Sequence, residues 1–199
     1  MRSKLKPLAN LKDLAAFNVD YDDETQARIA LDAASSSIRN AAASVITKTT
    51  STVQFATEAS RRLELPARPV WAVKRVLLDG LLVAGWRLVG SHLWRDEPWQ
   101  HAGDTPSVVE VTFTHGLAAV PSDIIALTCS LTAAGIAAMR EGYDPKRGIS
   151  YERIGDYQYG MTTGDQELLD PFQLPDATAQ ALAKRFRARS RTQVTGSVR

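Results

Sequence analysis

The side chains best suited to chemistry in this sequence are one cysteine, Cys129, and three histidines, His92, His101 and His115. Nucleophilic catalysis needs a Ser, Cys or Thr beside a histidine that an acid orients. Cys129 lies in an apolar stretch, where a thiol is usually an inert small hydrophobe. His115 ends a predicted strand and is interpreted as structural. Neither residue therefore predicts a nucleophilic site.

His92 and His101 lie in loop-like sequence near Asp96, Glu97 and Asp104. Carboxylates and histidines together bind metal ions or transfer protons, so an enzyme built on this group is one alternative. The paired ligand spacing of a zinc site is missing, as are a Gly-rich phosphate loop and the HExxH pattern. We therefore predict a protein that is not an enzyme and that has no cofactor and no metal.

The composition is that of an ordinary globular protein. Of 199 residues, 44% are hydrophobic, and 24 Lys or Arg stand against 22 Asp or Glu. A chain of this length buries roughly 70% of the surface that it exposes when unfolded, enough for one core with an inserted subdomain. The longest near-apolar stretch, Ile124–Met139, is 16 residues long. It is short of the roughly 20 residues that cross a bilayer, so we expect a soluble protein without membrane contact.

Helical patterns flank the middle of the sequence. One helix face recurs in steps of three and four, and Asp20 or Asp22 is its expected cap. The face consists of Ala27, Leu31, Ala34, Ile38, Ala41 and Val45. A second helix, apolar on nearly every side, is expected over Ile124–Met139. A third is expected from Asp176 to about Ala188.

The middle of the sequence has the pattern of strands. Asp79-Gly80 between two apolar, β-prone runs predicts a hairpin, because a type I′ turn needs positive φ at both central residues. Val109, Val111 and Phe113 alternate with polar residues, which predicts a half-buried strand. Together these signals predict a small antiparallel sheet between the helices.

These elements predict an α+β fold that is mainly α, a helical bundle with an inserted small antiparallel β-sheet and hairpin region. We expect a single domain. Its parts are an N-terminal helical part (1–49), an inserted β region (50–116), a second helical part (117–188) and a flexible basic tail (189–199).

The C-terminal end is strongly basic. After Asp176 the chain has no acid and six basic residues, which are Lys184, Arg185, Arg187, Arg189, Arg191 and Arg199. Clustered guanidinium groups bind phosphates or carboxylates, whereas a solvated, frayed terminus is the alternative interpretation. No basic stripe with interleaved aromatic residues is present, so direct base recognition is not expected.

Several segments, in their order along the chain, resemble the head-to-tail adaptor (connector) proteins of long-tailed bacteriophages, in particular those that infect actinobacteria. They are LPARPV at 65–70, the hairpin at Asp79-Gly80, LWR at 93–95, TFTHG at 112–116 with VPSD at 120–123, and IGDY at 154–157. The resemblance covers roughly residues 20–190. The sequence QYGM at 158–161 departs from the continuation expected in that family.

The resemblance implies a non-enzymatic structural protein of the virion. Such proteins form a ring, commonly of twelve copies, below the portal protein at the capsid vertex. The ring connects the portal to a stopper or tail completion protein, and double-stranded DNA passes through its lumen. The protein would be in the host cytoplasm during assembly. The C-terminal segment would reach the portal, with Lys184, Arg185, Arg187, Arg189 and Arg191 as candidate contacts to its acidic groups.

Contacts between copies are the last sequence-based expectation. The segment Ser150–Met161 has the pattern of an extended strand, and Ile154, Tyr157 and Tyr159 are candidates for pairing with a neighbouring copy's sheet edge. Pairing within the same chain is the alternative. A different function also stays open, that of a small binding module that attaches to nucleic acid through its basic C-terminal segment.

Overall fold

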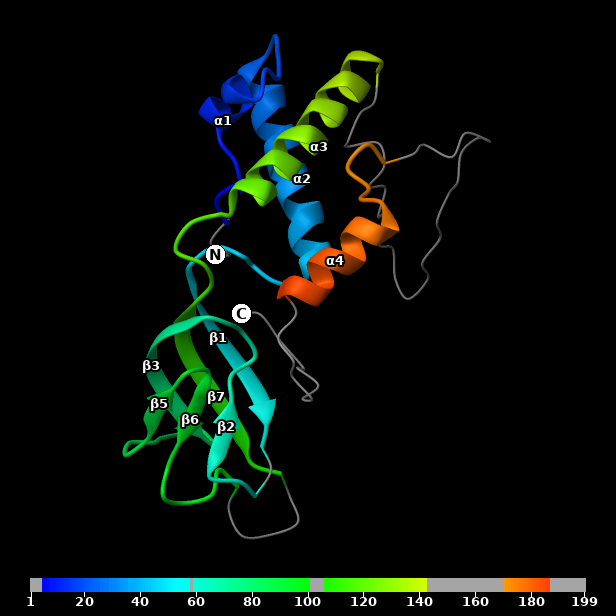
Figure 1. The fold of residues 1–199 in the computed structure, drawn as a ribbon. Coiled ribbons are helices and arrows are strands. Elements are labelled where there is room, and N and C mark those ends of the chain that lie inside the picture. The colour runs from blue at the N-terminus through cyan, green and yellow to red at the C-terminus, as the bar shows by residue number, and fades with distance from the viewer. Residues whose placement is uncertain (1–4, 58, 101–105, 143–169, 187–199) are drawn as a thin grey trace, which may run out of the picture. The chain divides into compact units, whose positions relative to one another are not determined.

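The computed structural model describes residues 5–57, 59–100, 106–142 and 170–186. Within these residues the chain forms four helices and seven strands, and the strands lie in two antiparallel sheets (Figure 1). Helices account for 37% and strands for 26% of the described residues. The prediction of a mainly helical bundle is therefore wrong. It underestimates the β part because four of the strands are two or three residues long, too short to show an alternating pattern.

The chain divides into two compact units. The helical unit comprises Lys6–Ile38 and Pro121–Pro175, and the sheet unit comprises Met1–Leu5, Arg39–Val120 and Asp176–Arg199. One of the boundaries between the units falls within the long helix α2 (Glu24–Ala42), and another lies just before the helix α3 (Ser122–Arg140). The expected single domain, with its inserted region at 50–116, stays a prediction.

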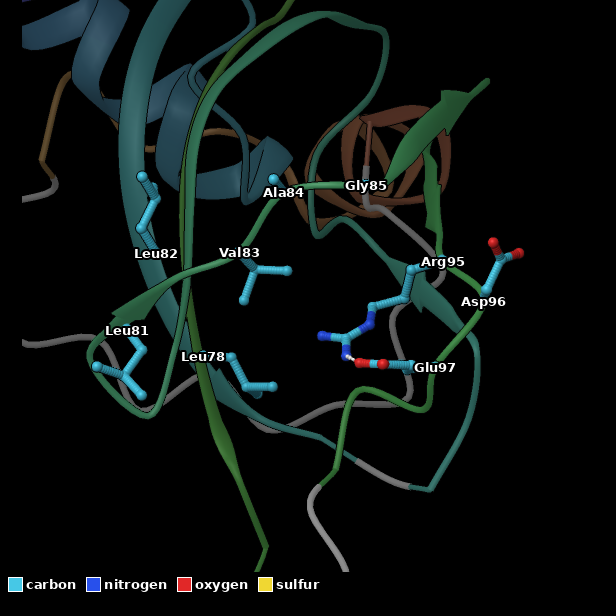
Figure 2. A pocket seen from close by; sticks show the side chains of 9 residues that line it. All are labelled: Leu78, Leu81, Leu82, Val83, Ala84, Gly85, Arg95, Asp96 and Glu97. Carbon is cyan, nitrogen blue, oxygen red and sulfur yellow. Dashed lines mark hydrogen bonds and ion pairs between the residues drawn. The ribbon is translucent and has the colours of Figure 1, made fainter.

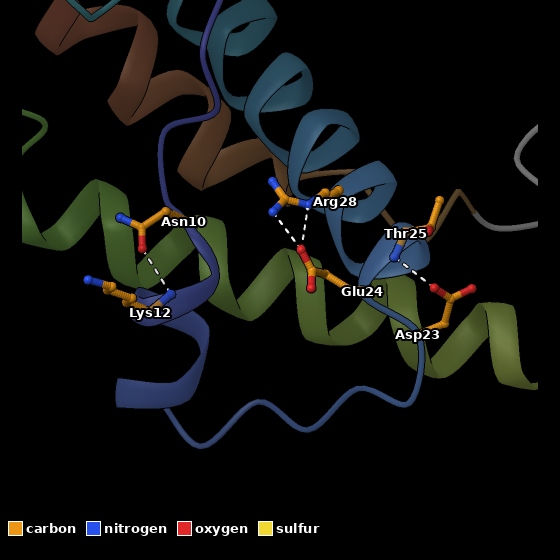
Figure 3. Close-up of polar contacts among 6 residues, drawn as sticks. All are labelled: Asn10, Lys12, Asp23, Glu24, Thr25 and Arg28. Carbon is orange, nitrogen blue, oxygen red and sulfur yellow. Dashed lines mark hydrogen bonds and ion pairs between the residues drawn. The ribbon is translucent and has the colours of Figure 1, made fainter.

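The short helix α1 (Leu11–Ala16) begins at a reciprocal pair of caps, of which Figure 3 shows the bond between Asn10 and Lys12. Oδ1 of Asn10 accepts hydrogen bonds from the backbone N–H groups of Lys12 (2.9 Å) and Asp13 (3.3 Å). The Asp13 carboxylate accepts in return from the backbone N–H of Asn10, at 2.8 Å. This capping box satisfies N–H groups that a helix terminus leaves without partners.

Helix α2 begins one residue after the acid that caps it. The Asp23 carboxylate accepts from the backbone N–H of Thr25 at 2.7 Å, which makes Asp23 the N-cap (Figure 3). The prediction of Asp20 or Asp22 is wrong because several neighbouring acids fit the same pattern. The predicted helix face is largely confirmed, since four of its members are at most 2% exposed: Ala27, Leu31, Ala34 and Ile38.

Helix α3 is apolar around most of its circumference. Its buried hydroxyls, on Thr128 and Thr132, each donate to the carbonyl oxygen four residues earlier at 2.7 Å. Its length and hydropathy are sufficient to cross a membrane, and 39% of this apolar stretch is buried within the described structure. Core helices of soluble proteins have the same properties, so the expected lack of membrane contact stays a prediction.

A segment before the last helix packs into the helical unit. The ring of Phe172 lies against Gly135 of α3, where an added Cβ would be 2.4 Å from two ring atoms. Oγ of Ser37, in α2, donates to the carbonyl oxygen of Phe172 at 2.6 Å. Glycine at position 135 thus makes room for the aromatic ring between the helices.

The sheet unit contains both sheets. The four-stranded sheet has the order β1-β7-β3-β4, formed by β1 (Thr49–Ala56), β7 (Val108–His115), β3 (Val70–Leu78) and β4 (Leu81–Leu82). The three-stranded sheet has the order β2-β6-β5, formed by β2 (Arg62–Glu64), β6 (His92–Trp94) and β5 (Arg87–Val89). The predicted hairpin is confirmed, because β3 and β4 pair across Asp79-Gly80, both of which have positive φ. The predicted strand is confirmed as β7, whose alternate side chains are buried.

The two sheets share one hydrophobic core. It contains side chains from the four-stranded sheet, from the three-stranded sheet and from the loop after β6, with Trp99 among the most deeply buried. Its buried members are Phe55, Leu63, Leu65, Val76, Leu78, Leu93, Trp99, Val109, Val111 and Phe113. The last helix, α4 (Asp176–Phe186), begins at the predicted residue, and Leu182 is its buried residue.

Candidate functional site

The TFTHG motif occupies the end of β7, where strand pairing explains most of its residues. The hydroxyls of Thr112 and Thr114 share hydrogen bonds of 2.9 Å with those of Thr52 and Thr50 on β1. Phe113, between them, points into the core and is fully buried. Thr–Thr pairs of this kind stabilise neighbouring strands. These three positions of the motif thus have a structural role within the sheet.

Gly116 allows two backbone segments to approach closely. Its φ is +96°, and an added Cβ would lie 2.3 Å from the carbonyl oxygen of Thr47. Directly beyond it, the N–H of Leu117 donates to the carbonyl oxygen of Ile46 at 2.8 Å. Only glycine combines this dihedral angle with this contact.

His115 lies near a serine hydroxyl, as a catalytic histidine does, but its pKa is lowered rather than raised. Its Nε2 lies 3.0 Å from Oγ of Ser51, and its ring centroid lies 4.8 Å from that of Phe113. Burial lowers the pKa of His115. An orienting carboxylate, as in a Ser-His-Asp triad, would raise that pKa. The Ser51–His115 pair is therefore interpreted as a cross-strand structural contact.

Cys129 is buried in α3, as expected for a small core residue. Burial, with a smaller contribution from Asp13, raises the pKa of its thiol. The thiolate, which is the nucleophilic form, is thereby disfavoured. The geometry therefore favours the predicted inert role.

The histidine and carboxylate group does not assemble into a metal site within the described residues. His92 lies on β6 with its Nε2 2.5 Å from Nη2 of Arg62. Burial and then the Arg62 charge lower the pKa of His92. His101 and Asp104 lie outside the described residues. Among the residues with described positions, no three His, Cys, Asp or Glu side chains gather closely enough to hold a metal ion.

Two of the predicted portal contacts lie at the end of α4. Lys184 and Arg185 line a cavity of about 820 Å³ together with Arg68 and the side chain of Phe186. Arg68 also pairs with Glu64 at 2.5 Å. The other predicted portal contacts, Arg187, Arg189 and Arg191, and the predicted inter-subunit residues, Ile154, Tyr157 and Tyr159, lie outside the described residues.

Strand β1 is an edge of the four-stranded sheet. Its register with β7 pairs Thr49 with His115 and continues residue by residue, and the N–H of Thr57 donates to the carbonyl oxygen of Ser107 just beyond it. In antiparallel pairs every second residue bonds the partner strand. The odd-numbered residues of β1 therefore bond β7, and the N–H and C=O groups of Thr50, Thr52 and Gln54 point away from the sheet.

Among the residues whose positions are described, this edge lacks the usual protection against pairing with another chain. Exposed edges are normally interrupted by charges, proline or bulges. Strand β1 has eight residues, TTSTVQFA, without charge or proline and with a regular register to β7. The opposite side of the sheet is different, since β3 carries Lys74 and Arg75 and has two register shifts against β7.

Sequence reasoning missed two features of the sheet unit. It assigned no role to the edge of β1, although an uncharged run of eight residues is visible in the sequence. It also assigned no role to Leu81 and Leu82, which directly follow the Asp79-Gly80 turn and are 70% and 73% exposed. Apolar residues at the tip of a hairpin are the signal that would have indicated an interaction surface.

A scan against protein-family models finds no match to this chain, and a search of the curated proteins finds none either. The sheet unit itself offers an unprotected strand edge, exposed leucines and a basic cavity. These are features of surfaces that bind other molecules.

Replacing Gly116 by alanine is expected to destabilise the sheet unit by at least ~2 kcal/mol, because the new Cβ meets backbone atoms at a positive φ. The matched control is Gly80→Ala, where φ is also positive but nothing lies within 4 Å of the added Cβ. It should cost only about 1 kcal/mol. Urea unfolding measures both variants, and equal losses would contradict the close-approach argument.

The lowered pKa of His115 makes stability depend on pH. The folded state favours the neutral ring, so its contribution is complete above the ordinary pKa of 6.5 and is lost as the pH falls toward the folded value. The free energy of unfolding should therefore decrease on acidification below 6.5. His115→Gln should flatten this decrease, and His92→Gln, at a half-buried position, should flatten it less. An unchanged profile in His115→Gln would rule out this assignment.

Proposed function

We propose that this chain is a subunit of the head-to-tail connector of a long-tailed bacteriophage. In this role it makes and breaks no covalent bond. Many copies, about twelve, form a ring that binds the portal on one side and a stopper or tail completion protein on the other. Double-stranded DNA passes through the lumen of the ring. The segments that resemble adaptor proteins, at 65–70, 112–123 and 154–157, are the sequence basis of the proposal.

The observation that carries the proposal is the edge of β1. A strand with three successive outward-facing N–H and C=O pairs, and with no charge or proline, is suited to being covered by another chain. In a ring, each copy presents the same two surfaces to its neighbours, and one weak contact is repeated many times. The proposal therefore places β1 at a contact with a neighbouring copy.

The basic end of α4 suits the portal side of the ring. Lys184 and Arg185 occupy its last turn, where cations are favoured by the helix dipole. The cavity that they line also includes Arg68 and contains no carboxylate among its lining residues. This charge would favour acidic groups of the portal.

The same cavity supports a second candidate function, attachment to nucleic acid. A cationic surface of this kind also attracts phosphates, and the salt dependence of binding distinguishes the two candidates. A module that contacts several phosphates loses orders of magnitude of duplex affinity between low and physiological salt. A connector subunit, which must release the genome, should show no tight duplex binding at any salt.

The proposal predicts that assembly depends on the outward N–H of Thr52. Thr52→Pro removes this donor without removing a bond to β7, and proline is tolerated at such edge positions. Thr52→Val is the matched control, because it also loses the hydroxyl but keeps the N–H. We expect native mass spectrometry to show rings for the wild type and Thr52→Val, alone or with the portal protein of the same genome. Thr52→Pro should form none.

Two outcomes would contradict these assignments separately. Rings of normal mass and stability from Thr52→Pro would remove β1 from the contact between copies and leave the connector proposal standing. A wild-type chain that stays monomeric both alone and with the portal would contradict the connector proposal. Circular dichroism of each variant checks that the strands have formed.

A further inference from the structure

The hairpin of β3 and β4 covers one side of a cavity of about 450 Å³ in the sheet unit (Figure 2). The residues on this side have no polar side chains and come from the end of β3, from β4 and from the loop that follows: Leu78, Leu81, Leu82, Val83, Ala84 and Gly85. The opposite wall is polar and comes from Arg95, Asp96 and Glu97, directly after β6. An apolar cavity with a few polar groups on one side is typical of a binding site.

The guanidinium of Arg95 is held in one position. Its Nη2 donates to Oε2 of Glu97 at 2.5 Å, and its central carbon lies 5.2 Å from the ring centroid of Trp99. Trp99 is itself fully buried, and the backbone N–H of Arg95 donates to the carbonyl oxygen of Arg61 at 3.1 Å. The side chain of Arg95 is only 10% exposed. The group is therefore positioned before any ligand binds.

One nitrogen of this guanidinium has no hydrogen-bond partner within the described part of the chain. Nη1 of Arg95 is buried and unpaired there, while Nη2 is satisfied by Glu97. Figure 2 shows the guanidinium reaching into the cavity toward Val83 and Leu78. Buried polar groups in folded proteins almost always have a partner. A ligand that fills the cavity and accepts a hydrogen bond from Nη1 would supply one.

The exposed residues Leu81 and Leu82 indicate that another part of the ligand is apolar. Leu81 and Leu82 stand at the rim of the cavity and are 70% and 73% exposed. Leucines this exposed next to an apolar cavity gain by burial against another apolar group. The ligand should therefore present an apolar side chain to the hairpin.

The charges around the cavity select a neutral acceptor. Glu97 already neutralises Arg95 at the cavity wall, whereas the Asp96 side chain points away in Figure 2, so a ligand carboxylate would come close to the negative Glu97. A carbonyl oxygen accepts the same hydrogen bond without this repulsion. A peptide backbone combines such carbonyls with apolar side chains.

We infer that this cavity binds an extended apolar segment of another protein. A leucine-sized side chain enters beside Leu78, Leu81 and Val83, which share one face of the hairpin, and the neighbouring backbone carbonyl accepts a hydrogen bond from Nη1 of Arg95. The inference does not depend on the connector proposal. If that proposal is correct, the segment belongs to an adjoining virion protein.

A capped leucine, N-acetyl-leucine methylamide, is the probe that tests this inference on the full chain. We expect it to shift the NMR signals of the Leu81–Gly85 amides and of the Trp99 indole at millimolar concentrations. N-acetyl-glycine methylamide, which lacks the side chain, should bind roughly tenfold more weakly. N-acetyl-leucine, which carries a carboxylate, should also bind more weakly than the capped amide.

Two variants distinguish the cavity from unspecific binding. Arg95→Lys keeps the charge beside Glu97 but lacks the second donor nitrogen of the guanidinium, and it should weaken binding of the capped leucine about tenfold. Leu81→Glu, on the face of the hairpin that carries Leu78, should abolish the shifts without disturbing the core. Val89→Glu is its matched control, since Val89 is 60% exposed but does not line the cavity.

Three results would overturn the inference. The first is the absence of any shift with the capped leucine. The second is tighter binding of N-acetyl-leucine than of the capped amide, which would make this an anion site. The third is wild-type binding by Leu81→Glu, which would place the probe elsewhere. Ring assembly is measured separately, so none of these results bears on the connector proposal.

Discussion

The sheet unit depends on β7, the strand that pairs along its length with β1 on one side and with β3 on the other. Its odd-numbered side chains, Val109, Val111, Phe113 and His115, are buried, and the first three belong to the core shared by both sheets. The side chains of Glu110, Thr112 and Thr114 form polar pairs on the other face, including an ion pair of 2.9 Å between Glu110 and Arg75. This one strand therefore fixes the register of its neighbours and determines which face of the sheet is buried in the core.

Sequence reasoning identified the parts whose patterns extend over several residues. The alternation in β7, the Asp79-Gly80 turn and the apolar face of α2 each involve local rules that repeat. The sequence does not predict the three-stranded sheet, because none of its strands exceeds three residues and their pairing depends on contacts across the core. The predicted proportion of helix to strand is therefore wrong, although the sequence does predict these individual helices and strands.

The candidate sites were harder to predict for a related reason. The spacing of Arg95, Glu97 and Trp99 suggests a local cluster, but nothing in the sequence tells that one guanidinium nitrogen faces a cavity beside a distant hairpin. In the same way, the open side of β1 follows from the order of strands in the sheet, which the sequence does not reveal. A site formed by residues that are distant in the sequence can be recognised only once the fold is known.

Two backbone segments at the ends of the β region meet within the sheet unit. Thr47 and Leu117 form a bridge at the base of the strands, and the lack of a side chain at Gly116 keeps the two backbone segments in contact there. The contact between these two segments therefore closes the β region, residues 48–116, into one loop of the chain. Its outer turns are therefore free to lengthen, shorten or change partner during evolution without altering the spacing of the flanking residues.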